Sequence, residues 1–170
     1  MIRTLLFLLA FLTSTSAHAA VEISFYSHEM TPVGIADVEF PHAFIVMRGT
    51  PDAGGKPIVG NWGFTATKIS PAILMGPVKG GIESADAAYI AASKRHITLR
   101  LSDVRLAAVQ ATFKRWAAVR GKSYDLETRN CVHFIAELAK AAGLATPNDP
   151  SLMKKPDAYL TAVAARNARR

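Results

Sequence analysis

The chain has 170 residues, of which 50% are hydrophobic and 19% are charged, and its formal net charge is +7. This balance excludes an intrinsically disordered chain, a collagen and a coiled coil, and the length suits one compact domain with one core. The excess of basic residues favours encounters with anionic polymers or surfaces. The single cysteine, Cys131, cannot form an internal disulfide, so it is either a small buried residue or a reactive group.

The first 19 residues are typical of a secretory signal peptide. Eight apolar residues, 5–12, follow Arg3, and a small-x-small triplet ends at Ala19. The apolar run is shorter than the roughly 18 to 20 residues that cross a bilayer, so no stable membrane anchor is expected. We therefore predict that the mature domain, residues 20–170, is periplasmic or secreted. An exported protein has little access to nucleic acid, so the basic charge is not interpreted as a nucleic-acid-binding patch.

The first part of the mature chain predicts strands. Val21, Ile23 and Phe25 alternate with polar neighbours and indicate a short strand. Turn-forming residues at 50–57 separate two further runs that predict an antiparallel hairpin, and a loop centred on residues 53 and 54 would pair residue 42 with residue 65. The pattern predicts strands over 38–48, 58–67 and 96–101, an irregular stretch over 70–81, and a stretch over 85–94 that is ambiguous between helix and strand.

The second part predicts helices. Ser102 is a good N-cap for a helix over 103–120. Another helix should start near Asn130 or Cys131 and end at Gly143, and Asp157 can cap a short terminal helix. Because strands come first and helices later, the expected fold class is α+β, with an antiparallel sheet packed against the helix that carries the cysteine.

Cys131 is the sharpest chemical feature of the sequence. A thiol in the first turn of a helix lies beside unpaired backbone N–H groups, which stabilise a thiolate and lower the pKa of the thiol. The same amides can hold the oxyanion of a tetrahedral intermediate. The alternative interpretation is a core cysteine at an ordinary helix start.

A thiol nucleophile needs a base, and four histidines are available in the mature chain. His133 lies two residues after Cys131, about 200 degrees around the helix, so it should pack or hydrogen bond behind the helix instead. His42 begins an apolar run directly after Pro41, where a strand would hold its ring rigidly. His96 is the reserve candidate, and His28 is expected in a solvent-exposed loop.

These residues resemble a known superfamily. The strings Pro-His-Ala-Phe-Ile-Val from Pro41 and Asn-Cys-x-His-Phe from Asn130 resemble the circularly permuted papain-like thiol hydrolases, which include NlpC-type and lecithin:retinol acyltransferase-like proteins. In that superfamily the histidine strand precedes the cysteine helix, as His42 precedes Cys131 here. The resemblance covers about residues 38–144 and implies a permuted papain-like fold.

The resemblance also implies roles for individual residues. Cys131 would be the nucleophile and His42 the base. A polar residue on the next strand would orient the imidazole, and Asn61 has the better chemistry for this role whereas Thr65 has the better register. No carboxylate or histidine occupies that strand. Tyr124 would line the substrate site, although it also fits a half-buried strand aromatic.

The expected function is that of an exported cysteine hydrolase that cleaves amide bonds in peptidoglycan stem peptides through a thioester. Two alternatives stay open: an acyltransferase or thioesterase acting on lipid or acyl esters, and a catalytically silent envelope binding module. No cofactor is invoked, and no metal site is predicted, because His42, His96 and His133 share no ligand spacing.

Overall fold

The computed structural model describes residues 20–29, 32–33, 37–38 and 40–168. The predicted signal peptide, residues 1–19, lies outside this range, so that prediction stays untested. The strands are β1 (Val21–His28), β2 (Pro32–Val33), β3 (Asp37–Val38), β4 (His42–Gly49), β5 (Ile58–Ala66), β6 (Gly80–Glu83) and β7 (Lys94–Leu101). The helices are η1 (Pro71–Leu74), α1 (Ala87–Ala92), α2 (Asp103–Ala117), α3 (Cys131–Ala141), η2 (Pro150–Leu152) and α4 (Pro156–Asn167), where η marks a 3-10 helix.

Five strands form one antiparallel sheet in the order β6-β5-β4-β1-β7, and β2 pairs with β3 separately. The ladder between β4 and β5 places Ile45 opposite Trp62 and Val46 opposite Asn61. This is the hairpin register that the sequence predicts, because it continues toward residue 65 opposite residue 42. The mixed α+β class is confirmed.

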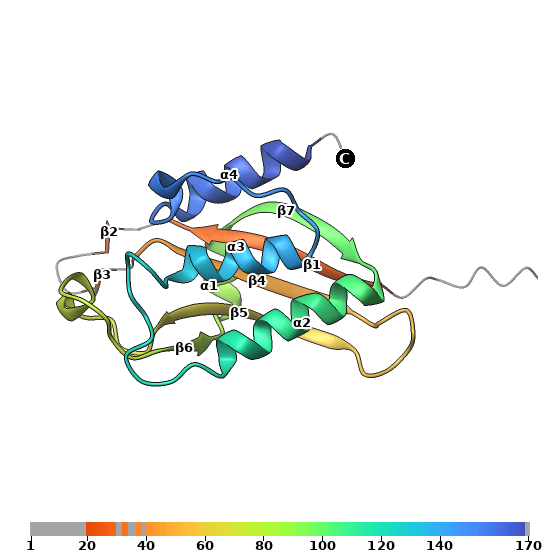
Figure 1. The fold of residues 1–170 in the computed structure, drawn as a ribbon, viewed down its shortest axis with the longest axis horizontal. Helices are drawn as coiled ribbons and strands as arrows, with labels where there is room; N and C mark the ends of the chain where they lie inside the picture. The colour runs from red at the N-terminus through yellow and green to blue at the C-terminus, as the bar shows by residue number, and fades with distance from the viewer. Residues whose placement is uncertain (1–19, 30–31, 34–36, 39, 169–170) are drawn as a thin grey trace, which may run out of the picture.

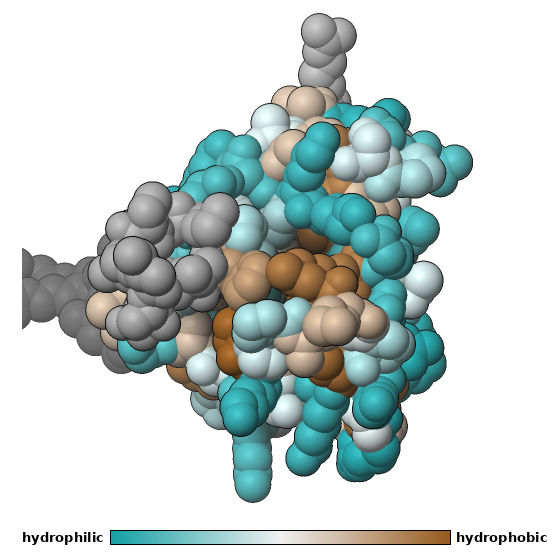
Figure 2. Space-filling model, turned by 90° about the vertical axis from the view of Figure 1, so that its left-hand side faces the viewer, coloured by the Kyte–Doolittle hydropathy of each residue, from teal (hydrophilic) through white to brown (hydrophobic). Residues whose placement is uncertain are grey.

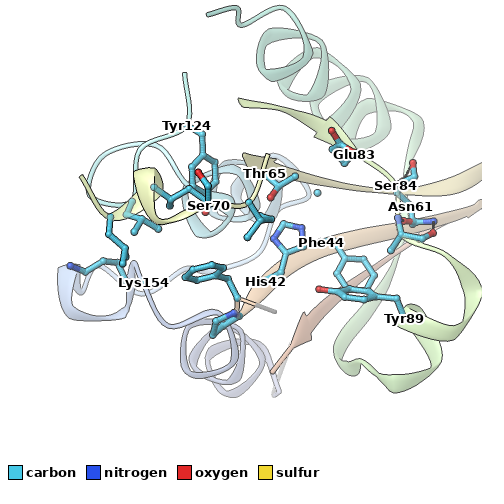
Figure 3. Close-up of a pocket in the computed structure, with 18 of the residues that line it drawn as sticks. His42, Phe44, Asn61, Thr65, Ser70, Glu83, Ser84, Tyr89, Tyr124 and Lys154 are labelled. Carbon is cyan, nitrogen blue, oxygen red and sulfur yellow. Dashed lines mark hydrogen bonds between the residues drawn. The ribbon is translucent and has the colours of Figure 1, made fainter. Parts of the chain in front are cut away.

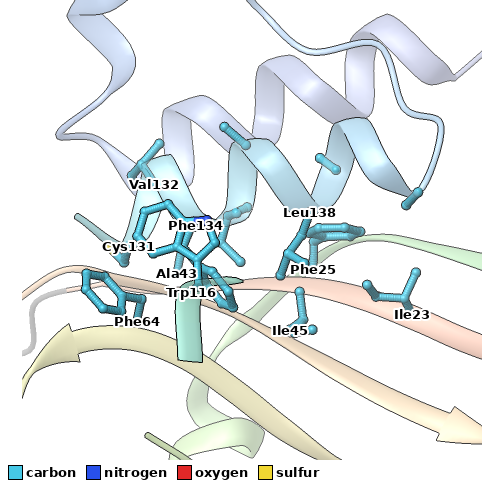
Figure 4. Close-up of a cluster of buried hydrophobic side chains, with 14 of the residues drawn as sticks. Ile23, Phe25, Ala43, Ile45, Phe64, Trp116, Cys131, Val132, Phe134 and Leu138 are labelled. Atoms are coloured by element: carbon cyan, nitrogen blue, oxygen red, sulfur yellow. The ribbon is translucent and has the colours of Figure 1, made fainter. Parts of the chain in front are cut away.

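The core lies between the sheet and the helices α2, α3 and α4, which cover one of its faces, whereas α1 packs on the other (Figure 1). Alternation along the strands explains this, since Ile23 and Phe25 of β1 and Ile45 of β4 point toward Phe134 and Leu138 of α3 (Figure 4). All five side chains are fully buried, each with 0% of its surface exposed. None of the helices among the described residues is long and apolar enough to span a bilayer.

Two segments differ from the sequence expectations. The stretch 70–81 was expected to be irregular, but it contains η1 and the start of β6. Gly80 is needed there because an added Cβ would lie 2.8 Å from the Phe64 ring and 2.9 Å from Tyr124. The ambiguous stretch 85–94 divides into α1 and the first residue of β7, with Asp86 capping α1 through Tyr89 N–H.

Candidate active site

Asn130 fixes the start of the cysteine helix. Its Oδ1 accepts hydrogen bonds from the backbone N–H groups of Val132 and His133 at 2.8 and 3.2 Å. Its Nδ2 donates to the carbonyls of Leu126 and Met153 at 2.7 and 2.8 Å. The side chain is 2% exposed, so these partners replace the water that it loses. Asn130 therefore ties three segments of chain together at the first turn of α3.

Cys131 is the first residue of α3 and lies in the core beside Ala43 and Phe64 (Figure 4). Burial raises the pKa of its thiol to about 11. Hydrogen bonds from the backbone N–H groups of Ala43, Val132 and Cys131 itself act in the opposite direction, because they stabilise the thiolate. The lowered pKa that helix position alone predicts is thus wrong for this structure, since burial outweighs the local dipoles.

His42 is the first residue of β4, and its ring is stacked with that of Phe44, with centroids 6.3 Å apart. The ring also lies against Gly63 of β5, where an added Cβ would overlap Nε2. Burial, and secondarily the neighbouring His28, lowers the pKa of His42 to about 4, so the imidazole is neutral near pH 7.

The peptide link between His42 and Ala43 is where the proposed base and nucleophile come together. Alternation sends the Ala43 side chain toward α3 and the His42 ring to the side of Phe44. The N–H of Ala43, which belongs to this link, hydrogen bonds to the Cys131 sulfur. Among the described residues, no hydrogen bond joins the His42 ring to that sulfur. The structure thus places the sulfur against the backbone next to His42, whereas the His42 ring lies on the opposite face of β4.

A pocket of about 1280 Å³ opens beside His42 and contains several predicted site residues (Figure 3). Its walls come from the starts of β4 and η1, from β5, from the β6–α1 connection and from the segment after α2. Ile69 and Leu74 line it and are 52% and 68% exposed, and Figure 2 shows apolar side chains gathered on this end of the molecule. The lining includes His42, Phe44, Asn61, Gly63, Thr65, Glu83, Tyr89, Tyr124 and Lys154. Cys131 itself is only 3% exposed and does not line this pocket.

The two candidates for an orienting residue differ in their contacts. Asn61 is occupied elsewhere, because its Oδ1 accepts from Ala85 N–H at 2.6 Å and its Nδ2 donates to the Ala85 carbonyl at 3.0 Å. This paired bond fastens the β6–α1 connection to β5. Thr65 lines the pocket near His42 (Figure 3). Neither side chain hydrogen bonds to His42 in the described structure.

Tyr124 lies at the pocket wall, 8% exposed, with its ring 5.8 Å from that of Phe64. Its backbone pairs with Val78 through hydrogen bonds of 2.8 and 2.9 Å. Burial, and secondarily the charge of Cys131, raises the pKa of Tyr124, so the phenol stays protonated. Tyr124 thus combines the expected place at the pocket with the packing of an ordinary core aromatic.

His133 and His28 make contacts that stabilise the fold. His133 accepts the Asn130 N–H through Nδ1 at 3.3 Å, which completes a capping box, as its predicted position behind the helix allows. The prediction that His28 lies in an exposed loop is wrong: His28 ends β1, is 5% exposed and stacks on Tyr89 at 3.9 Å. The strand extends further than its apolar alternation indicated, because α1 covers its end.

His96 belongs to a separate polar cluster. Its Nε2 lies 2.8 Å from Ser27 Oγ and 3.4 Å from Asp157 Oδ1. The Lys94 ammonium group lies 2.7 Å from the same Asp157 oxygen. This cluster joins β1 and β7 to the start of α4. Among the described residues, no group of three or more His, Cys, Asp or Glu side chains is placed to hold a metal ion.

Comparisons of the chain with protein-family models, with curated proteins and with solved structures find no match.

Proposed function

We propose that the chain is an exported cysteine hydrolase of the permuted papain-like class, which cleaves amide bonds in peptidoglycan stem peptides. One observation carries the proposal: the sulfur at the start of α3 accepts a hydrogen bond from the peptide N–H that directly follows His42, beside a large pocket. The α+β fold, the order of histidine strand and cysteine helix, and the resemblance of both motifs support the class. The apolar run after Arg3 supports export.

In the proposed mechanism the Cys131 thiol gives its proton to the His42 imidazole, and the thiolate attacks the amide carbon. The tetrahedral oxyanion is held by the Cys131 backbone N–H, which has no carbonyl partner within the helix because it lies in the first turn. The imidazolium then protonates the leaving amine as the C–N bond breaks, which leaves a thioester on Cys131. Water, deprotonated by His42, hydrolyses the thioester and restores the thiol.

The free protein is in a resting state in this proposal. A thiol with a pKa of about 11 and an imidazole with a pKa of about 4 are both neutral near pH 7, which opposes proton transfer between them. Substrate binding must therefore bring the sulfur and the ring into a direct hydrogen bond. Catalytic hydrogen bonds that form only in the substrate complex are common.

The test compares digestion of purified peptidoglycan by the mature protein, by Cys131→Ala and by His42→Ala. We expect release of muropeptides by the mature protein only, together with an intact-mass adduct on Cys131 when turnover is quenched in acid. His133→Gln is the matched control, because it removes a histidine that points away from the sulfur. Equal background release by the mature protein and Cys131→Ala would refute the proposal.

A second candidate is a catalytically silent envelope binding module. The neutral thiol and imidazole favour it, as does the amide of Asn61, which is occupied by Ala85. One measurement distinguishes the two candidates. A binding module would bind muropeptides with the same affinity in the mature protein and in Cys131→Ala, and neither protein would release a product.

A further inference from the structure

In the part of the chain that the structure describes, no side chain hydrogen bonds to the His42 ring, and a catalytic imidazole needs such a partner. A neutral imidazole acts as a base at one nitrogen only if the hydrogen sits on the other, and a hydrogen-bond acceptor normally fixes that choice. Asn61 is occupied by Ala85, and β5 carries no carboxylate. Among the described residues, an acceptor for the ring would therefore have to come from a strand other than β5.

Gly63 opens a way for a more distant strand to reach the ring. The Nε2 atom of His42 occupies the space that a Cβ at Gly63 would fill. Any side chain at this position would separate the ring from the rest of the pocket. Because glycine has none, the ring nitrogen lies directly over the backbone of β5 at Gly63.

Glu83 lies directly across this glycine. The ladder between β5 and β6 pairs Gly63 with Glu83, so the side chain of Glu83 leaves the sheet on the face against which the His42 ring lies. Directly opposite positions have Cβ atoms about 4.5 to 5.5 Å apart, which the length of a glutamate side chain spans. Glu83 and His42 line the same pocket (Figure 3). The Glu83 carboxylate has no hydrogen bond or ion pair with the described residues.

We propose that the Glu83 side chain, whose carboxylate points away from His42 in Figure 3, turns across the bare backbone of Gly63 to accept a hydrogen bond from His42 Nε2–H, which makes Glu83 the positioning residue of the ring. This inference rests on the proposed function, because it supplies the third residue of the proposed site. The hydrogen on Nε2 leaves Nδ1 as the acceptor for the thiol proton. The carboxylate also stabilises the imidazolium that forms when the thiol is deprotonated.

Other titratable groups surround the ring and affect the test. His28 neighbours His42 across the β1–β4 ladder, and the groups that share the pocket are Asp86 and Tyr89 at the start of α1, Tyr124 after α2, and Lys154 after η2. None of these is changed in the variants below. A difference between variants therefore reports the carboxylate of Glu83 alone.

The test is a histidine NMR titration of the mature protein labelled with ¹⁵N, which gives the tautomer and the pKa of His42 without any substrate. We expect hydrogen on Nε2 in the wild type, and a pKa of His42 that falls by about one unit in Glu83→Gln, because a negative partner raises the pKa of an imidazole. Glu83→Asp, which keeps the charge, should give an intermediate value. Glu22→Gln is the matched control, since Glu22 is exposed at the opposite end of β1 from His28; it should leave His42 unchanged.

Hydrogen on Nδ1 in the wild type, or an equal His42 pKa in the wild type and in Glu83→Gln, would overturn the inference. These outcomes are separate from failure of the proposed function. If Glu83→Gln shifts the His42 pKa while the mature protein and Cys131→Ala release no muropeptides, Glu83 positions His42 in a protein that is not a peptidoglycan hydrolase.

Discussion

At the scale of single residues, burial decides the chemistry of Cys131. We predict that iodoacetamide alkylates the folded protein at pH 7.5 about two orders of magnitude more slowly than the same chain in urea, because burial raises the thiol pKa to about 11 from an ordinary value near 8.5. The rate should climb as the pH approaches 11. Since the chain has one cysteine, intact mass measures the reaction directly. Folded and unfolded chains reacting equally fast at pH 7.5 would show that the thiolate is already formed in the free protein.

The residue level also shows what sequence could and could not predict at the site. The position of Cys131 at a helix start and the place of His42 in a strand follow from local pattern and are found, although the strand predicted over 38–48 begins at His42 in β4. The direction of the thiol pKa does not follow, because it depends on Phe64 and Ala43, which reach the sulfur from distant segments. The engagement of Asn61 with Ala85 is equally non-local, since it depends on where the β6–α1 connection passes.

At the scale of elements, the cap of α3 is held by one side chain. We predict that Asn130→Ala lowers the free energy of unfolding by about 2 to 3 kcal/mol, because it removes a helix cap and leaves the Leu126 and Met153 carbonyls without their donor. Urea denaturation measures this loss. Asn130→Asp keeps the acceptor for Val132 and His133 but not the two donated bonds, so it should lie between alanine and the wild type. A loss below about 0.5 kcal/mol for alanine would contradict the role of the cap.

The docking of α4 should depend on pH through His96. Burial lowers the pKa of His96 below 6.5, with Asp157 opposing and Lys94 adding to this effect. Below about pH 6.5 the unfolded chain binds a proton that the folded chain resists, so stability decreases as the pH falls toward the folded value. We expect the unfolding temperature to fall between pH 7 and pH 5, and this slope to flatten in His96→Gln. The Asp157 carboxyl has a lowered pKa and loses its contribution only below about pH 4, outside that window.

At the scale of the whole molecule, the hairpin and the helices were predictable because turn residues and periodicity are local. The strand β6 was not, because Gly80 and Gly81 look like loop residues in the sequence, and the packing of Phe64 and Tyr124 that leaves no room for a side chain at Gly80 comes from distant segments. The number of strands in the sheet and their order likewise depend on contacts between distant segments, such as the pairing of β1 with β7.

The net charge of the predicted mature chain, +6 once Arg3 is removed from the +7 of the full sequence, predicts a salt-dependent affinity for an anionic wall polymer. Binding of the mature protein to purified peptidoglycan should weaken markedly between 0.1 M and 1 M salt, as the Debye length falls from about 10 Å to about 3 Å. Cys131→Ala should bind with the same salt dependence, because the sulfur is neutral and buried. A sedimentation assay measures the bound fraction. Binding that does not change with salt would show that charge does not drive the encounter.

The Asn61 side chain makes two hydrogen bonds to the backbone of Ala85. These bonds make one rim of the pocket stiffer than the other. On one side, the connection into α1 is anchored to the middle of the sheet. On the other, the backbone bonds of η1 stay within the turn, from Ile73 to Ser70 and from Met75 to Ala72, and the buried Ile73 side chain connects the turn to the core. A bulky ligand would therefore enter by displacing the η1 side, and amide hydrogen exchange should slow there first once the ligand is seated.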